Sequence, residues 1–221
     1  MTDNLYWNTT SELLRSILLK LSDQEIFNGF RLVGGTALSL QIGHRKSDDI
    51  DLFTDQYYGS VDFYIIDSFL RRTFKYVSSP SQPLSNIGRS YFIGDSRFNA
   101  VKLDLYHTDT FIWPTLQVNK CKLASLEEII AMKLEIFQDR GRKKDFWDIH
   151  ALSNKFTFNQ MLNFHQQRYP YSHNVELIRK NILDFEKADD DLSPKCIRGL
   201  NWELIKIDLI IFVKIEQPSS S

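Results

Sequence analysis

Hydrophobic and polar positions follow two different periods along the first half of this chain. Apolar residues at helical spacing predict amphipathic helices at 11–21, 36–41 and 61–74. Alternating or short apolar runs predict strands at 30–33, 48–54, 89–93 and 100–106, and a further short strand after Pro114. Turns are predicted between Pro80 and Pro83 and around Gly94 and Asp95. This half is therefore predicted to form an α/β unit.

Helical patterns alone fill the second half of the chain. Ser125 and Glu128 form a predicted capping box ahead of an apolar pattern that runs to Phe137. After a break at Gly141, helices are predicted at 143–152, 158–167, 174–187 and 202–215. The sequence thus predicts an α+β protein with an α/β core over 1–118, a helical domain over 119–217 and a flexible tail over 218–221.

The composition is that of an ordinary folded protein, with 43% hydrophobic and 25% charged residues. A formal net charge of −1 excludes a uniformly basic nucleic-acid coat, although a local basic site is compatible with it. Cys121 and Cys196 lie far apart and form no CxxC pair, so neither a disulfide framework nor a zinc site is predicted. We expect two incidental thiols in a reducing compartment.

No segment of the sequence predicts insertion into a membrane. Residues 1–10 are polar and lack the apolar part of a signal peptide. The most apolar tract, 204–215, is too short for a span and is interrupted by charged residues, namely Lys206, Asp208 and Lys214. We therefore expect a cytoplasmic protein without a membrane partner.

A glycine pair followed by two aspartates is the most specific feature of the sequence. Gly34 and Gly35 allow a tight backbone turn in front of a helix N-terminus, an arrangement that suits a phosphate. Positions 36–48 then separate the pair from Asp49 and Asp51, which share one face of the predicted strand. Two neighbouring carboxylates repel unless a cation lies between them, and hard oxygen ligands suit Mg²⁺. A solvated strand edge is the alternative for an isolated Asp-x-Asp.

An apolar residue, a glycine pair and a later Asp-x-Asp-apolar run together resemble the signature of the DNA polymerase β-like nucleotidyltransferases. The resemblance implies a small mixed sheet flanked by helices, two Mg²⁺ ions (or Mn²⁺) held by Asp49 and Asp51, and an NTP near Gly34, Gly35 and Thr36. Asp48 offers another carboxylate, but strand alternation places it on the opposite face, where a loop or capping role is expected.

Such enzymes need a third carboxylate from a neighbouring strand, and Asp104 is the candidate. It lies between Leu103 and Leu105 in an alternating run, where an acid is costly to bury unless it is paired or bound to a metal. Lys102 lies on the same face and is an alternative, purely structural partner. The catalytic and metal-binding set is thus predicted to be Asp49, Asp51 and Asp104.

Residues 127–152 (EEIIAMKLEIFQDRGRKKDFWDIHAL) resemble the second block of the AbiEii/AbiGii toxin family. In that family a helix lysine precedes a basic stretch and a Lys-Asp-x-x-Asp motif. The matching positions are Lys133, then Arg140 or Arg142, then Lys144, Asp145 and Asp148. The GGTALSL and DIDLF segments are also typical of the family, so the resemblance covers residues 30–152.

The resemblance implies nucleotide contacts for Lys133, Arg142 and Lys144, with Asp145 and Asp148 in support. Four cations lie close together at 140–144 and could meet a triphosphate or an RNA backbone. A solvated loop between helices is the alternative, since basic residues favour helix C-termini. His44 and Arg45, in the loop before the aspartates, could approach a substrate, although His44 fits an ordinary loop residue.

The predicted activity is attack of an acceptor hydroxyl on the α-phosphate of an NTP, with release of pyrophosphate. The family resemblance implies a toxin of a bacterial toxin–antitoxin or phage-defence pair, with a cognate antitoxin and an RNA acceptor such as a tRNA 3′ end. Transfer to a small molecule or to protein is the alternative within enzymes. A catalytically silent nucleotide- or protein-binding scaffold is the alternative from another class.

Overall fold

A computed structural model describes residues 5–79 and 87–215. Within these residues the chain forms two compact units. The first unit consists of the described parts of 1–42 and 47–124, and the second consists of 43–46 with the described part of 125–221. The short segment 43–46 therefore belongs to the second unit although both of its chain neighbours belong to the first.

The first unit is built on a mixed seven-stranded sheet in the order β3-β4-β5-β2-β1-β7-β6. The strands are β1 (Arg31–Leu32), β2 (Asp49–Thr54), β3 (Tyr76–Val77), β4 (Gly88–Ser96), β5 (Asn99–His107), β6 (Leu116–Val118) and β7 (Cys121–Leu123). β2 runs parallel to β5 and antiparallel to β1, and β1 runs parallel to β7. The α+β class and the predicted mixed sheet are confirmed.

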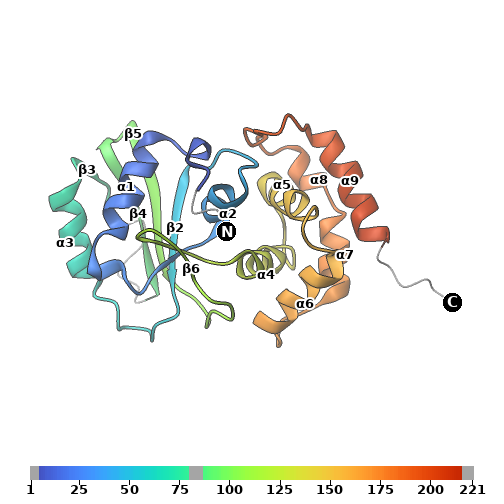
Figure 1. The fold of residues 1–221 in the computed structure, drawn as a ribbon, viewed down its shortest axis with the longest axis horizontal. Coiled ribbons are helices and arrows are strands. Elements are labelled where there is room, and N and C mark those ends of the chain that lie inside the picture. The colour runs from blue at the N-terminus through green and yellow to red at the C-terminus, as the bar shows by residue number, and fades with distance from the viewer. Residues whose placement is uncertain (1–4, 80–86, 216–221) are drawn as a thin grey trace. The chain divides into compact units, whose positions relative to one another are not determined.

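Helices cover both faces of this sheet. They are α1 (Glu12–Ser22), α2 (Gly34–Ile42) and α3 (Phe63–Thr73), with short 3-10 turns η1 (Trp7–Thr9) and η2 (Glu25–Phe27). Figure 1 shows α1 and α3 on one side of the strands and α2 on the other. Leu18 of α1 and Leu52 of β2 line the same pocket, so the buried face of β2 points toward α1. The alternate face of β2, which carries Asp49 and Asp51, points away from α1.

The second unit is helical in its described residues. Its helices are α4 (Leu126–Ile136), α5 (Lys143–Leu152), α6 (Phe158–Arg168), α7 (Val175–Ile182), α8 (Glu186–Asp189) and α9 (Trp202–Ile215). α4 packs against α6, and α5 packs against α9. The Ser125 side chain accepts a hydrogen bond from Glu128 N and so caps α4, which is the serine half of the predicted capping box. The Glu128 carboxylate, fully buried, pairs with the Arg168 guanidinium of α6.

Some predicted boundaries differ from the observed ones. The turn between β4 and β5 lies at residues 97–98 rather than at Gly94 and Asp95, because β4 continues through those residues to Ser96, with an irregular register near Gly94. The single helix predicted at 174–187 is interrupted between α7 and α8. The predicted turn at Pro80 and Pro83 and the predicted tail at 218–221 lie outside the described residues.

Strand β7 changes the boundary between the two units. The sequence places this boundary at 118/119, whereas the observed division follows Ala124. Residues 121–123 pair antiparallel with β6 and, through Leu123, parallel with Leu32 of β1, so they complete the sheet. The run is only three residues long, and its pairing with β1 joins segments about 90 positions apart in the chain.

Candidate functional site

The predicted acids of the first unit lie on two neighbouring strands. In the parallel pair of β2 and β5, Asp51 stands opposite Asp104, and Asp49 stands opposite Lys102. Ile50 is fully buried, whereas Asp49 and Asp51 are half-buried, which is the alternation predicted from the sequence. Because cross-strand partners point to the same side of a sheet, the three carboxylates share one open face.

A glycine turn brings the start of α2 against Asp51. Gly34 has φ +67°, a conformation that residues with a side chain adopt at a cost of roughly 1–2 kcal/mol. A Cβ at this position would lie 2.7 Å from Asp51 Oδ2, so a side chain here would also collide with the acid. Val33 N donates to the carbonyl O of Asp51 at 2.9 Å. The N-terminus of α2, which favours negative charge, therefore faces the acids at very close range.

Thr36 and Gly35 lie in the first turn of α2. The Thr36 side chain is buried and faces inward, where its hydroxyl lies 2.8 Å from Ser47 Oγ and donates to the carbonyl O of Asp49. These bonds fix the beginning of β2 to the glycine turn. Contacts of Gly34, Gly35 and Thr36 with a nucleotide stay a prediction.

Asp104 is paired with the lysine that the sequence offered as its alternative partner. Lys102 Nζ lies 2.6 Å from Asp104 Oδ2, whereas Asp104 Oδ1 is buried and has no hydrogen-bond partner among the described residues. Burial lowers the pKa of the Lys102 ammonium, but the hydrogen bond to Asp104 and the charges of Asp104, Asp49 and Asp51 together raise it above its ordinary value. All three carboxylates thus act on this one ammonium group.

The described residues hold no group of three His, Cys, Asp or Glu side chains arranged to bind a metal ion by themselves. Magnesium does not require such a cage, since it is commonly held by one or two carboxylates together with waters and substrate phosphates. Asp104 stands opposite Asp51 in the strand pair, and its unpartnered oxygen fits one such ligand position. The donor set of Asp49, Asp51 and Asp104 therefore suits a hard divalent cation that arrives with a nucleotide.

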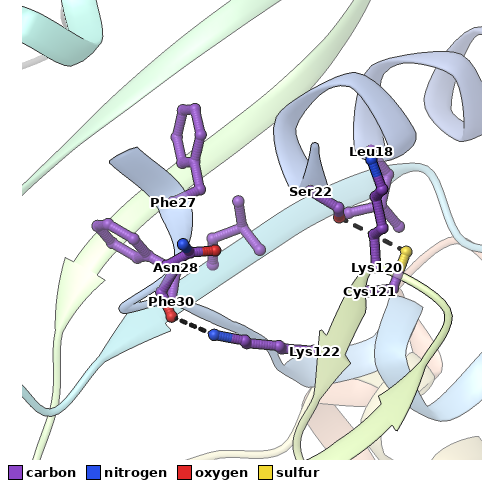
Figure 2. Close-up of a pocket in the computed structure, with 9 residues that line it drawn as sticks. Leu18, Ser22, Phe27, Asn28, Phe30, Lys120, Cys121 and Lys122 are labelled. Carbon is purple, nitrogen blue, oxygen red and sulfur yellow. Dashed lines mark hydrogen bonds between the residues drawn. The ribbon is translucent and has the colours of Figure 1, made fainter. Parts of the chain in front are cut away.

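A pocket in the first unit lies on the opposite face of the sheet. It is lined by residues of α1, η2 and β7, and by Leu52, whose side chain points away from the face that carries Asp51. In Figure 2, Lys122 Nζ donates to the carbonyl O of Asn28 at 2.7 Å, and the Ser22 hydroxyl contacts Cys121 Sγ at 3.5 Å. Because strand alternation separates the two faces, this pocket is distinct from the acid cluster.

The second unit contains a buried ionic cluster around Asp148. Lys133 Nζ lies 2.6 Å from Asp145 Oδ1 and 2.7 Å from Asp148 Oδ2. Arg45 Nε and Nη2 bond the two oxygens of Asp148 at 2.7 and 2.9 Å, and His44 Nε2 lies 2.7 Å from Asp148 Oδ1. All five residues are at most 4% exposed. Lys133 is thus held by the two aspartates that the sequence assigned to its support.

His44 and Arg45 are core residues of the second unit rather than exposed loop residues. Arg45 also forms an isolated β-bridge with Cys196, and Ile197 N donates to the carbonyl O of His44 at 3.0 Å. The bidentate Arg45–Asp148 contact matches two guanidinium donors to two carboxylate oxygens. Sequence reasoning missed this contact, because the two residues lie 103 positions apart.

Charge pairing keeps this cluster ionised despite its burial. Burial raises the pKa of the Asp148 carboxyl, but the cations Arg45 and Lys133 and the hydrogen bonds from His44 and Arg45 hold that pKa well below its ordinary value. Burial lowers the pKa of Lys133, yet Asp145 and Asp148 raise it overall. For His44 burial is the stronger effect, and it lowers the pKa of the imidazole.

The basic stretch at 140–144 does not act as one surface. Arg142 is exposed, and its backbone N donates to Asp145 Oδ2 at 3.0 Å. Lys143 is buried, and its Nζ donates to the carbonyl O atoms of Asp189 and Asp191 at 3.0 and 2.5 Å. Lys144 is half-buried at the start of α5. Nucleotide contacts of Arg142, Lys144 and Lys133 stay predictions.

Stability is expected to fall as the pH drops below about 6.5, the ordinary pKa of histidine. Below the ordinary histidine pKa the unfolded chain binds a proton at His44, whereas the folded protein keeps this imidazole neutral. Proton binding therefore favours the unfolded chain, and stability is lost as the pH falls from the ordinary pKa through the lowered pKa of the folded protein. His165 and His173 have lowered pKa values and act in the same direction. The urea concentration at the midpoint of unfolding should therefore decrease as the pH is lowered from 7.5 to 5.5.

His44→Asn removes one of these protonation sites and keeps a donor toward Asp148, so its midpoint should depend less steeply on pH than that of the unaltered protein. Equal slopes for the two proteins would show that His44 does not contribute.

Comparison with known proteins identifies the family of this chain. The profile of the family described as nucleotidyl transferase AbiEii toxin, type IV toxin–antitoxin system, matches residues 16–212. The protein aq_aa25 of Aquifex aeolicus (strain VF5) is 28% identical over 185 residues, which cover 80% of this chain and 84% of that protein.

Two solved structures share the fold. JHP933 from Helicobacter pylori superposes with a TM-score of 0.58 at 16% identity, over 92% of this chain and 88% of that one. MenT4, a nucleotidyltransferase toxin from Mycobacterium tuberculosis H37Rv, superposes with a TM-score of 0.56 at 14% identity, over 91% and 80% of the two chains. Identities this low show the fold and not the substrate.

The mixed sheet and the match to the family profile place the chain in the nucleotidyltransferase class. The chain belongs to the AbiEii nucleotidyl transferase toxin family of type IV toxin–antitoxin systems. Family membership implies an NTP substrate and a cognate antitoxin. No helix within 5–79 or 87–215 has both the length and the apolar character needed to cross a bilayer.

Proposed function

We propose that the protein transfers a nucleoside monophosphate from an NTP to a hydroxyl of an RNA acceptor, with a tRNA 3′ end as the first candidate. Asp49, Asp51 and Asp104 hold the divalent cations, which are Mg²⁺ or Mn²⁺. The observation that carries the proposal is the cross-strand register that sets Asp51 beside Asp104, directly against the glycine turn at Gly34.

The residues of this site have separable tasks. When bound, the metal ions lower the pKa of the attacking hydroxyl and stabilise the charge of the departing pyrophosphate. Gly34 lets the Asp51 carboxylate lie directly against the glycine turn, because a Cβ there would collide with Asp51 Oδ2. The amide groups at the start of α2 donate to the phosphates, as a helix N-terminus commonly does. The acceptor hydroxyl approaches on the open face of β2 and β5.

An RNA acceptor is supported by the side chains beside the acids. Phe92 of β4 is 50% exposed and stands opposite Lys102. Lys102 is the next residue before Asp104 on the same face of β5, so Phe92 lies near the acids. An aromatic face next to a cation suits the stacking of an unpaired base and contact with its phosphate. Toxin-family membership is compatible with such an acceptor and does not by itself specify it.

The test is incubation of the purified protein with each of the four α-labelled NTPs, Mg²⁺ and separate acceptors: total tRNA, other RNA and protein. We expect label in the tRNA fraction, dependent on the divalent ion and on one preferred NTP. Label in protein or in a small molecule alone would favour the alternative reaction, which is nucleotide transfer to protein or to a small molecule. A protein that binds Mg²⁺-NTP but labels no acceptor would favour the catalytically silent scaffold.

A further inference from the structure

Lys102 places a positive charge among the three acids of β2 and β5. Its ammonium lies 2.6 Å from Asp104 Oδ2, and its backbone stands opposite Asp49 in the β2–β5 register. The negative charges of Asp49, Asp51 and Asp104 all act on it. The Lys102 side chain therefore satisfies the need for a positive charge among three neighbouring carboxylates.

The same contact conflicts with metal binding at Asp104. A metal ion needs the lone pairs of the carboxylate, and Lys102 already occupies Oδ2, while only Oδ1 lacks a partner among the described residues. An ammonium group and a divalent cation also repel each other at this range. The lysine stem is flexible and its side chain is 40% exposed, so the ammonium can withdraw toward solvent without unpacking the sheet.

We propose that Lys102 is an internal counter-cation of the acid cluster, which competes with divalent metal for Asp104 and leaves Asp104 Oδ2 when the metal binds. This inference rests on the proposed function, because it requires the three acids to be the metal site. Lys102 is a positioning residue in this account: it keeps the carboxylates together without metal. It also weakens binding of the free ion relative to an ion that arrives with an NTP.

Mn²⁺ binding without nucleotide tests the competition directly. Lys102→Met removes the ammonium and keeps the apolar stem, so its Mn²⁺ affinity, measured by electron paramagnetic resonance, should rise roughly threefold to tenfold. The matched control is Lys120→Met, which removes the same charge from a surface ion pair with Asp23 in the same unit. The control should bind Mn²⁺ as the unaltered protein does.

Thermal unfolding gives a second readout, in which loss of the Lys102 charge should weaken the protein without metal rather than strengthen metal binding. Without metal, Lys102→Met should unfold at a lower temperature than the unaltered protein, because Asp104 loses its ion pair and the repulsion among the three carboxylates is less compensated. Added Ca²⁺ or Mg²⁺ should remove that difference. Lys102→Gln keeps a hydrogen-bond donor without the charge and should show the same pattern, which preserves the test if the methionine variant folds poorly.

The outcomes separate this inference from the proposed function. Unchanged or weaker Mn²⁺ affinity in both Lys102 variants would overturn the competition. If Asp51→Asn still abolished Mn²⁺ binding in that case, the metal site itself would stand. Absence of Mn²⁺ binding by the unaltered protein, with and without NTP, would overturn both the inference and the assigned metal site.

Discussion

Asp51→Asn is expected to lower nucleotide transfer by at least roughly 10²- to 10³-fold while leaving the protein folded. Asp51 is half-buried on the open sheet face, faces Asp104 and contacts the glycine turn at Gly34. Asparagine has nearly the same shape but lacks the charge that binds a divalent cation. The loss should appear in the turnover of the labelled-NTP assay, with circular dichroism and the unfolding temperature nearly unchanged.

Asp48→Asn is the matched control for this substitution. Asp48 is exposed and precedes β2, so it is the neighbouring carboxylate that should not bind the metal. Its activity should stay within about twofold of the unaltered protein, since surface substitutions of this kind have small effects. Substantial transfer by a purified Asp49→Asn, Asp51→Asn double variant would refute the assignment of these acids.

Asp148→Ala is expected to cost about 3–5 kcal/mol of the free energy of unfolding. The substitution removes the shared partner of Lys133, Arg45 and His44. Lys133 keeps Asp145, whereas the buried Arg45 guanidinium loses its bidentate carboxylate. Of the substitutions considered, this one should affect stability most. Urea unfolding followed by circular dichroism at pH 7 measures the change.

The control for Asp148 is a carboxylate in an exposed ion pair. Asp67 pairs with Arg71 one helical turn away on α3, with 25% and 44% of their side chains exposed. Asp67→Ala should cost only about 0.3–0.5 kcal/mol, the usual value for such a pair. Equal losses for the two variants would mean that the buried cluster contributes no more than a surface contact.

Local features of the sequence were sufficient to predict the acid-bearing strands. The alternation over 49–54 predicts which residues share a face, and the observed burial of β2 follows it residue by residue. Asp104 was predicted from the third carboxylate that the family resemblance implies and from the cost of an acid within an apolar run, and the register places it beside Asp51. These predictions succeed because strand periodicity depends on neighbouring residues in the chain.

Features that depend on distant pairing could not be predicted in the same way. The assignment of 43–46 to the second unit depends on Arg45 reaching Asp148, for which the sequence contains no local signal. Lys102 was foreseen only as an alternative partner of Asp104, since spacing alone does not tell a lysine that pairs from one that points to solvent. The inward orientation of Lys143 could not be predicted for a similar reason, because its partners at 189 and 191 come from a distant segment.

The central claim is that Asp49, Asp51 and Asp104 bind one shared metal centre beside the glycine turn. Its most direct test is anomalous diffraction from crystals grown with Mn²⁺ and a non-hydrolysable NTP. The account predicts a Mn²⁺ peak about 2.0–2.3 Å from carboxylate oxygens of both Asp51 and Asp104, with NTP phosphate oxygens completing the shell. A nucleotide-bound Mn²⁺ that contacts neither Asp51 nor Asp104 would contradict it.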